Sequence, residues 1–186
     1  MAVITETGRL RVREWTEEPT DLARFYDIYS RVEVVRWFGA APNLPLTDPD
    51  QAAGVIRGWR SASFPDGRYG FWAIEVRDTG LVAGTALVKP LRGRDMSPVA
   101  EIEVGWHLHP DCQGNGYATE AARAVLAREF AAGTELIHAV VLPGNEPSIA
   151  VTRRLGMTHV GRRTDWYGGV EMETFVLSAT DYADPS

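Results

Sequence analysis

The stretch EIEVGWHLHPDCQGNGYATEAARAVLAREF, residues 101–130, places the strongest constraint on how this chain folds. Its first eight residues alternate apolar with polar or small side chains, which predicts a strand with one buried face. Gly114 and Gly116 then turn the chain, and apolar residues from Tyr117 onward recur at helical spacing. A helix that begins on glycines directs unpaired backbone N–H groups and the positive end of its dipole outward. The stretch therefore predicts a phosphate-binding loop between a strand and a helix.

The rest of the chain alternates strand and helix signals. Hydrophobic period and turn residues predict strands at 9–13, 69–77, 81–88, 136–142, 158–166 and 170–177. They predict helices at 16–30, 47–60 and 145–155, and a short helical or irregular stretch at 32–38. Hairpin turns are expected at 78–80 and 168–169, and loops at 40–46, 61–68 and 89–98. No composition shift or repeat marks a boundary, so we expect one α/β domain, residues 1–186, with a mixed sheet.

The composition narrows the class of partner. The chain has 186 residues, 45% of them hydrophobic and 24% charged, which suits one globular domain. Its net charge of −6 argues against broad binding to nucleic acid or anionic membrane, because both require a cationic surface. Neither a signal peptide nor an apolar run long enough to span a membrane is visible, and Cys112 has no second cysteine with which to form a disulfide. We expect a cytoplasmic protein with no direct nucleic-acid or membrane partner.

Three known phosphate-loop motifs can be compared with the glycine stretch. A Walker loop requires Gly followed by Lys and Ser or Thr, which is absent here, so an NTPase is disfavoured. A dinucleotide fingerprint requires three spaced glycines, of which Gly114 and Gly116 supply two. A nicotinamide- or flavin-dependent oxidoreductase therefore stays as an alternative. The third pattern is Gln/Arg-x-x-Gly-x-Gly/Ala, which QGNGYA at 113–118 matches at every position.

This third pattern is the acyl-CoA pyrophosphate loop of the GNAT N-acetyltransferases, and the chain resembles that family, in particular its RimJ/RimL-like branch. The resemblance covers residues 7–178 and rests on RLRVR at 9–13, EVGWHLHP at 103–110, GYATEA at 116–121, NEPS at 145–148 and LGM at 155–157. It implies a GNAT-like domain with a mixed, mostly antiparallel sheet of about seven strands, flanked by about four helices. It also implies acetyl-CoA as co-substrate and a primary amine as acceptor.

The resemblance assigns the binding of the co-substrate to residues on both sides of the loop. The backbone of Trp106, His107 and Leu108 would pair with the pantetheine arm where the sheet splays, and Asn145 would bind the same arm. Core packing of Trp106 and Leu108 and helix capping by Asn145 are the alternatives. The pyrophosphate would be held by backbone N–H groups of the loop. The loop residues are Gln113, Gly114, Asn115, Gly116, Tyr117, Ala118 and Thr119.

Two side chains are catalytic candidates by the same resemblance. Glu103, which stands before the Gly-x-x-Leu of this branch, would take a proton from the amine, with Glu101 or a water-mediated route as the alternatives. Ser148 would protonate the leaving thiolate, unless it is a capping or solvated serine. A backbone N–H near Gly105–Trp106 would meet the oxyanion of a direct transfer.

Other residues with reactive side chains are given no catalytic role. His107 and His109 share a strand face, but two histidines without a third ligand are insufficient, so we expect no metal. Cys112 has no partnered base in the sequence, which disfavours a covalent acyl-enzyme. The arginines 123, 153 and 154 either reach outer phosphates or are surface charge. The aromatic residues of RWFG at 36–39, Trp72 and WY at 166–167 belong either to the acceptor pocket or to the core.

The sequence therefore favours an acetyl-CoA-dependent N-acetyltransferase that moves an acetyl group directly to a primary amine through a ternary complex. The acceptor is expected to be a protein N-terminus or a small-molecule amine. A non-catalytic acyl-CoA-binding protein of the same fold is the main alternative, beside the oxidoreductase. A homodimer is compatible with the family, although no stretch of the sequence identifies an interface.

Overall fold

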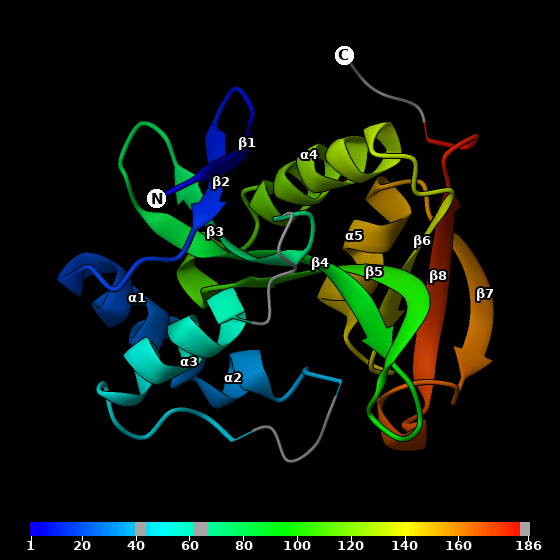
Figure 1. The fold of residues 1–186 in the computed structure, drawn as a ribbon, viewed down its shortest axis with the longest axis horizontal. Helices are drawn as coiled ribbons and strands as arrows, with labels where there is room; N and C mark the ends of the chain where they lie inside the picture. Colours follow the sequence, from blue (N-terminus) through cyan, green and yellow to red (C-terminus); the bar gives the residue numbers. More distant parts are fainter. Residues whose placement is uncertain (40–43, 62–66, 183–186) are drawn as a thin grey trace.

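The computed structural model describes residues 1–39, 44–61 and 67–182, which build one eight-stranded sheet and five α-helices (Figure 1). The strand order is β1-β2-β3-β4-β5-β6-β8-β7, and every neighbouring pair is antiparallel except β5 and β6. The strands are β1 (Val3–Glu6), β2 (Leu10–Glu14), β3 (Gly70–Val76), β4 (Val82–Arg92), β5 (Pro98–Leu108), β6 (Leu136–Val141), β7 (Thr158–Arg163) and β8 (Met172–Ser178). The helices are α1 (Pro19–Tyr29), α2 (Val32–Val35), α3 (Gln51–Ser61), α4 (Tyr117–Ala131) and α5 (Glu146–Arg154).

The two faces of the sheet carry separate hydrophobic cores because strand side chains alternate between faces. On β3, Trp72 and Ile74 point into the core that includes α4 and α5, whereas Ala73 points into the core formed with α1, α2 and α3. The small side chains Ala118, Ala121 and Ala122 of α4 are buried against the sheet. Among the described residues no helix is long and apolar enough to cross a bilayer.

The sheet opens at β5 and β6, the one parallel pair among the described strands. β5 and β6 are in register only at Ile102 opposite Ile137 and Glu103 opposite His138. Beyond these pairs, β5 continues along β4 to Leu108, whereas β6 continues along β8 to Val141. The diverging strands β5 and β6 leave an opening in the sheet between them. The resemblance predicted that the sheet would splay at this point.

One expected loop is wrong. The sequence predicted a loop over 89–98, but β4 runs to Arg92, β5 begins at Pro98, and only 93–97 form the turn. Pro90 remains within β4 because the register shifts between Pro90 and Arg92, and such an irregularity tolerates a residue that cannot donate to the ladder. The structure also adds β1, which the sequence did not predict, and counts eight strands and five helices where about seven and four were expected.

Most other expected elements are confirmed with end shifts of a few residues. The hairpin at 78–80 joins antiparallel β3 and β4, with Gly80 at a φ of +70°. The strand expected at 158–166 ends at Arg163, and the turn before β8 is a short 3₁₀ segment, η2, over Tyr167–Gly169. The loops expected at 40–46 and 61–68 lie partly outside the described residues.

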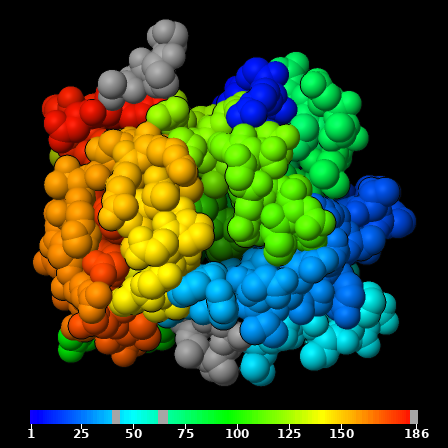
Figure 2. All heavy atoms as spheres, turned by 180° about the vertical axis from the view of Figure 1, so that it is seen from behind, coloured from blue at the N-terminus to red at the C-terminus, as the bar shows by residue number. Residues whose placement is uncertain are grey.

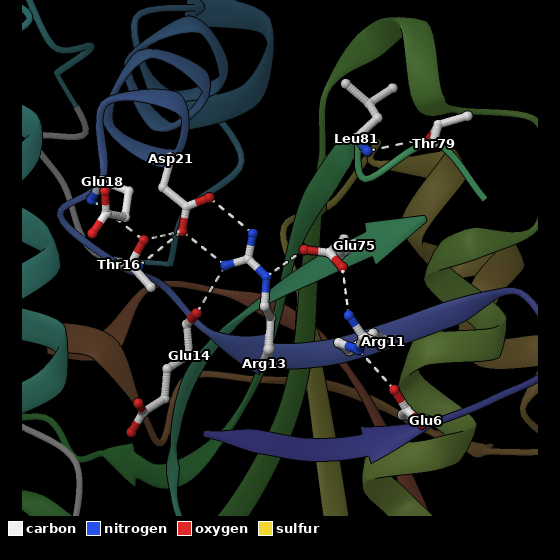
Figure 3. Close-up of polar contacts among 10 residues, drawn as sticks. All are labelled: Glu6, Arg11, Arg13, Glu14, Thr16, Glu18, Asp21, Glu75, Thr79 and Leu81. Carbon is white, nitrogen blue, oxygen red and sulfur yellow. Dashed lines mark hydrogen bonds and ion pairs between the residues drawn. The ribbon is translucent and has the colours of Figure 1, made fainter. Parts of the chain in front are cut away.

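A buried ionic network fastens the N-terminal strands to α1 (Figure 3). The Arg13 guanidinium donates to both Asp21 oxygens at 2.7 and 2.8 Å and to Glu75 Oε2 at 2.6 Å. Arg11 adds contacts to Glu6 and Glu75 at 2.7 and 3.2 Å. Since these groups come from β1, β2, β3 and α1, the network holds four elements together through charge-assisted hydrogen bonds.

Candidate active site

The main cavity of the described residues, of about 1670 Å³, occupies the opening between β5 and β6. From behind, the surface is hollowed between α4 and α5 (Figure 2). Typical small-molecule pockets measure roughly 300–1,000 Å³, so this cavity has room for two substrates at once. Its walls come from the start of α4, the splayed strands, α5, and residues 33–39 at and after α2.

The start of α4 leaves backbone N–H groups without intrahelical partners. Gly114 and Gly116 both have a φ of +79°, which residues other than glycine rarely adopt, and Gly116 caps the helix without a side-chain hydrogen bond. The Glu120 N–H donates to the Gly116 carbonyl at 3.0 Å, so the N–H groups of Tyr117, Ala118 and Thr119 precede the first intrahelical bond. These groups and the helix dipole together favour a phosphate.

Side chains near this turn fit the same ligand. The Thr119 hydroxyl is buried without a hydrogen-bond partner among the described residues, and Thr119 lines the cavity. Asn115 donates its side-chain amide to the Cys112 and Gln113 carbonyls at 3.2 Å, which fixes the shape of the loop. A buried hydroxyl without a partner, beside helix N–H groups that have no intrahelical partner, is a donor set that suits an anionic ligand.

Glu120, which also lines the cavity, holds the residues between β1 and β2. Its carboxylate accepts from the Thr7 hydroxyl at 2.5 Å and from the Arg9 guanidinium at 2.5 and 2.8 Å. Burial alone would raise the pKa of Glu120, but the hydrogen bonds from Thr7 and Arg9 lower it overall. The residues between β1 and β2 are thereby tied to the first turn of α4.

The splayed part of β5 forms one wall of the cavity. Trp106, His107 and Leu108 line it, with Val140 and Val141 of β6 opposite. This segment of β5 pairs with β4 along one edge, and its other edge does not pair with β6. Its free backbone edge can therefore accept an extended ligand that carries amide groups.

On α5, the structure confirms a capping role for Asn145. The Ser148 N–H donates to Asn145 Oδ1 at 3.4 Å, and Asn145 is buried at the edge of the cavity. Ser148 is half-buried and also lines the cavity. Both residues are thus placed to reach a ligand, and capping does not occupy the Asn145 amide nitrogen.

Glu103 is buried on the cavity wall and meets two partners that the sequence did not predict. Its Oε1 atom accepts hydrogen bonds from both the Lys89 ammonium and the Tyr167 hydroxyl. Lys89 Nζ also lies 2.7 Å from the Tyr167 hydroxyl oxygen. Glu101, the alternative base, is exposed and does not line the cavity within the described residues.

His107 and His109 have different surroundings. His107 stacks on Phe38 with ring centroids 4.3 Å apart, and its Nδ1 lies 3.2 Å from the Tyr29 hydroxyl. Burial, aided by the Lys89 charge, lowers the pKa of His107 to about 3, so the ring is neutral. His109 is buried beside Asp27, 3.2 Å from its carboxylate. Across residues 1–39, 44–61 and 67–182, no group of three or more His, Cys, Asp or Glu could hold a metal ion.

Cys112 and the three outer arginines differ in their position relative to the cavity. Cys112 is buried, the Arg24 guanidinium lies 3.4 Å from its sulfur, and burial raises the pKa of the thiol. Arg123 and Arg154 line the cavity, with Arg123 donating to the Arg154 carbonyl at 2.6 Å. Arg153 does not line the cavity in the described part of the chain.

Comparison with known proteins agrees with this architecture. Residues 9–158 match the family described as the acetyltransferase (GNAT) domain, and the chain belongs to that family. The Bacillus subtilis (strain 168) protein called uncharacterized N-acetyltransferase YoaA is 29% identical over 181 residues, which cover 96% of this chain and 97% of the relative.

Solved structures share the fold. Mycobacterium smegmatis RimJ, in complex with CoA-disulfide, superposes with a TM-score of 0.74 at 19% identity, over 94% of this chain and 84% of that one. RimL, the ribosomal L7/L12 alpha-N-protein acetyltransferase in complex with coenzyme A, has a TM-score of 0.75 at 14% identity, over 97% and 99% of the two chains. The expected family is confirmed, and these two neighbours share its fold.

Proposed function

We propose that this protein is an acetyl-CoA-dependent N-acetyltransferase that moves an acetyl group to a primary amine. The observation that carries the proposal is the single cavity that joins the open start of α4 to the splayed edge of β5. Membership of the GNAT family supports it. So do the RimJ and RimL complexes with forms of coenzyme A, because both share the fold.

The described residues fit the co-substrate along its length. Backbone N–H groups of residues 114–119 and the unpartnered Thr119 hydroxyl bind the pyrophosphate, whereas the Gln113 N–H already donates to the Pro110 carbonyl at 3.1 Å. The free edge of β5 over 106–108 pairs with the amides of the pantetheine arm, and the Asn145 amide reaches the same arm. When bound, acetyl-CoA supplies a thioester-activated acetyl group.

Three groups of the chain serve the transfer step. Glu103 accepts the proton that the amine loses as its nitrogen bonds to the acetyl carbon. A backbone N–H at Gly105–Trp106 stabilises the negative charge that develops on the carbonyl oxygen. Ser148 donates a proton to the thiolate that leaves as the carbon–sulfur bond breaks. Transfer is direct because Cys112 is buried against Arg24 and lies off the cavity lining, so it offers no nucleophile there.

The acceptor enters from the α2 side, where the cavity walls are aromatic. Phe38 stacks on His107, and Trp59 stacks on Phe71 at 4.5 Å. A protein N-terminus and a small-molecule amine both suit this side. One catalytic domain over residues 1–186, a cytoplasmic location and a homodimer are part of the same proposal.

Calorimetric titration tests the choice of co-substrate. Acetyl-CoA is expected to bind with one site per chain, because the loop and the β5 edge complement the pyrophosphate and pantetheine, whereas NADH is expected to show no saturable heat. Saturable binding of NADH without binding of acetyl-CoA would instead support the oxidoreductase.

A further inference from the structure

Lys89 is the only lysine among the 19 Lys and Arg residues of the chain. Its ammonium donates a hydrogen bond to the carboxylate of Glu103, the proposed base. Lysine presents a compact ammonium, whereas arginine presents a wide planar fork that needs more room. The Lys89 Nζ reaches both the Glu103 carboxylate and the Tyr167 hydroxyl from a side chain that is 19% exposed. A compact ammonium thus contacts both oxygens at this position.

Tyr167 is held in an uncommon conformation. Its φ is +50°, a value that residues other than glycine rarely adopt unless the surrounding structure enforces it. Gly39 packs on the ring so closely that a Cβ there would lie 3.1 Å from Tyr167 Cδ2. Lys89 Nζ lies 5.2 Å from the ring centroid. The turn that carries Tyr167 is thus fixed by contacts that direct its hydroxyl to Glu103.

Both partners bind the same oxygen of Glu103. Lys89 and Tyr167 engage Oε1, and no described residue donates a hydrogen bond to Oε2. Burial and the nearby Glu103 charge raise the pKa of Tyr167, so its hydroxyl keeps its proton and remains a donor. A carboxylate fixed through one oxygen retains the other as an acceptor for a substrate proton.

We propose that Lys89 and Tyr167 are positioning residues that hold Glu103 through Oε1 and present Oε2 to the amine of the acceptor. The proposal rests on the proposed function and on Glu103 as its base. Lys89 balances the buried carboxylate charge, and Tyr167 fixes the orientation of the carboxylate. Both act through Glu103 and neither contacts the acetyl group.

A double-mutant cycle tests this coupling in thiol-release assays with a primary-amine acceptor. Glu103→Gln is expected to lower kcat by about 10²–10⁴-fold, the usual contribution of a positioned base. Tyr167→Phe is expected to lower kcat roughly 10–100-fold, with the KM for the amine changed less than about 3-fold. The double variant should be no slower than Glu103→Gln alone, because Tyr167 acts only through Glu103.

The matched control is Tyr26→Phe, on α1, which packs against the core of α1–α3 and lies outside the cavity lining in the described residues. It should retain wild-type kcat. Lys89→Arg should lose kcat to an extent similar to Tyr167→Phe, because it keeps the charge but not the compact shape. Thermal unfolding of each variant separates loss of fold from loss of rate.

The single lysine also gives a readout that does not need turnover. Protein labelled with ¹⁵N-lysine has one side-chain ammonium signal, that of Lys89. This signal is expected to be protected from solvent exchange in the wild type, and to exchange at least 10-fold faster in Glu103→Gln and measurably faster in Tyr167→Phe. A signal that exchanges rapidly in the wild type would show that the three groups do not meet, and would overturn the proposal.

The outcomes separate the positioning role from the proposed function. If Tyr167→Phe lowers only the melting temperature while kcat stays unchanged, the contact is structural and the proposal is wrong, although the acetyltransferase stands. If Glu103→Gln retains full kcat, the assignment of the base and the positioning role fail together while amine acetylation remains. If the wild type acetylates no amine while binding acetyl-CoA, the proposed function fails, and the positioning role with it.

Discussion

His107 is a titratable residue that the cavity keeps uncharged. It contacts Phe38 and Tyr29, and burial together with the Lys89 charge lowers its pKa to about 3 from an ordinary 6.5. The ring is therefore neutral above about pH 5, and it contributes shape and hydrogen bonding to the cavity wall. A pH dependence of turnover near 6.5 would need another source.

The same shift predicts how stability depends on pH. Below pH 6.5 the unfolded chain binds a proton at His107 that the folded chain refuses, so stability falls as the pH drops from about 6.5 toward 3. Between pH 8 and pH 5 this residue should cost the wild type up to about 2 kcal/mol of unfolding free energy. Urea denaturation of His107→Gln should show a correspondingly smaller loss over that range. Equal losses of unfolding free energy in the wild type and His107→Gln would contradict a neutral His107 in the folded protein. The control variant is His159→Gln, on exposed β7.

At the scale of elements, the N-terminal hairpin is fastened at two places. Arg13 joins β2 to α1 and β3 in a buried network (Figure 3), and Glu120 joins residues 7 and 9 to the start of α4. Removal of one member of a buried pair leaves the other charge uncompensated, whereas exposed pairs contribute little. Loss of the buried Arg13 network should therefore lower the unfolding free energy more than loss of the more exposed Arg9–Glu120 pair.

Asp21→Ala should lower the unfolding free energy by about 3–5 kcal/mol, because Arg13 is then buried without a full counter-charge. The double change Arg13→Met with Asp21→Leu should recover most of that loss. Glu171→Ala, which removes an exposed partner of Arg162, should change stability by less than about 1 kcal/mol. Chemical denaturation measures all three, and an Asp21→Ala protein as stable as Glu171→Ala would refute the role of the network.

The turn before α4 yields a prediction about binding. At Gly116 the φ of +79° would strain any other residue and displace the N–H groups at the start of the helix. Gly116→Ala should weaken acetyl-CoA binding at least about 10-fold by calorimetry, equivalent to about 1.4 kcal/mol. Gly58→Ala, in the middle of α3 with open space around its Cβ, is the matched control and should leave the affinity unchanged. Equal affinities for the two variants would argue against the anion site.

At the scale of the whole molecule, sequence reasoning located the elements that line the cavity through local signals. The glycine loop, the strand before it and the capped helix at Asn145 are each encoded within a few neighbouring residues, so their positions could be predicted. The contacts of Tyr167 with Glu103 and Lys89 could not, because they join two strands to a turn 64 and 78 residues further on. The contact of Lys89 with Glu103 depends on the register of β4 against β5. The two prolines and Gly93 of 89–98 predict a loop that includes Lys89, and the register shift that accommodates Pro90 depends on the pairing of β4 with β5.

The exposure of Glu101 could not be predicted from the sequence either. The alternation of side chains places Glu101 and Glu103 on one face of the strand but does not indicate where the cavity ends. The opening itself depends on β6 leaving β5 after only two paired positions, which is a property of the sheet as a whole. The site is thus a local loop motif completed by long-range pairing.

Amine-dependent release of thiol from acetyl-CoA tests the central claim most directly, with the product identified by mass spectrometry. Across a panel of primary amines and short peptides, the wild type should release one thiol for each N-acetylated product, and Glu103→Gln should be slower by about 10²–10⁴-fold on the same acceptor. Saturable binding of acetyl-CoA with no amine-dependent thiol release and no acetylated product across the panel would contradict the account, and would favour a protein that binds acyl-CoA without catalysing transfer.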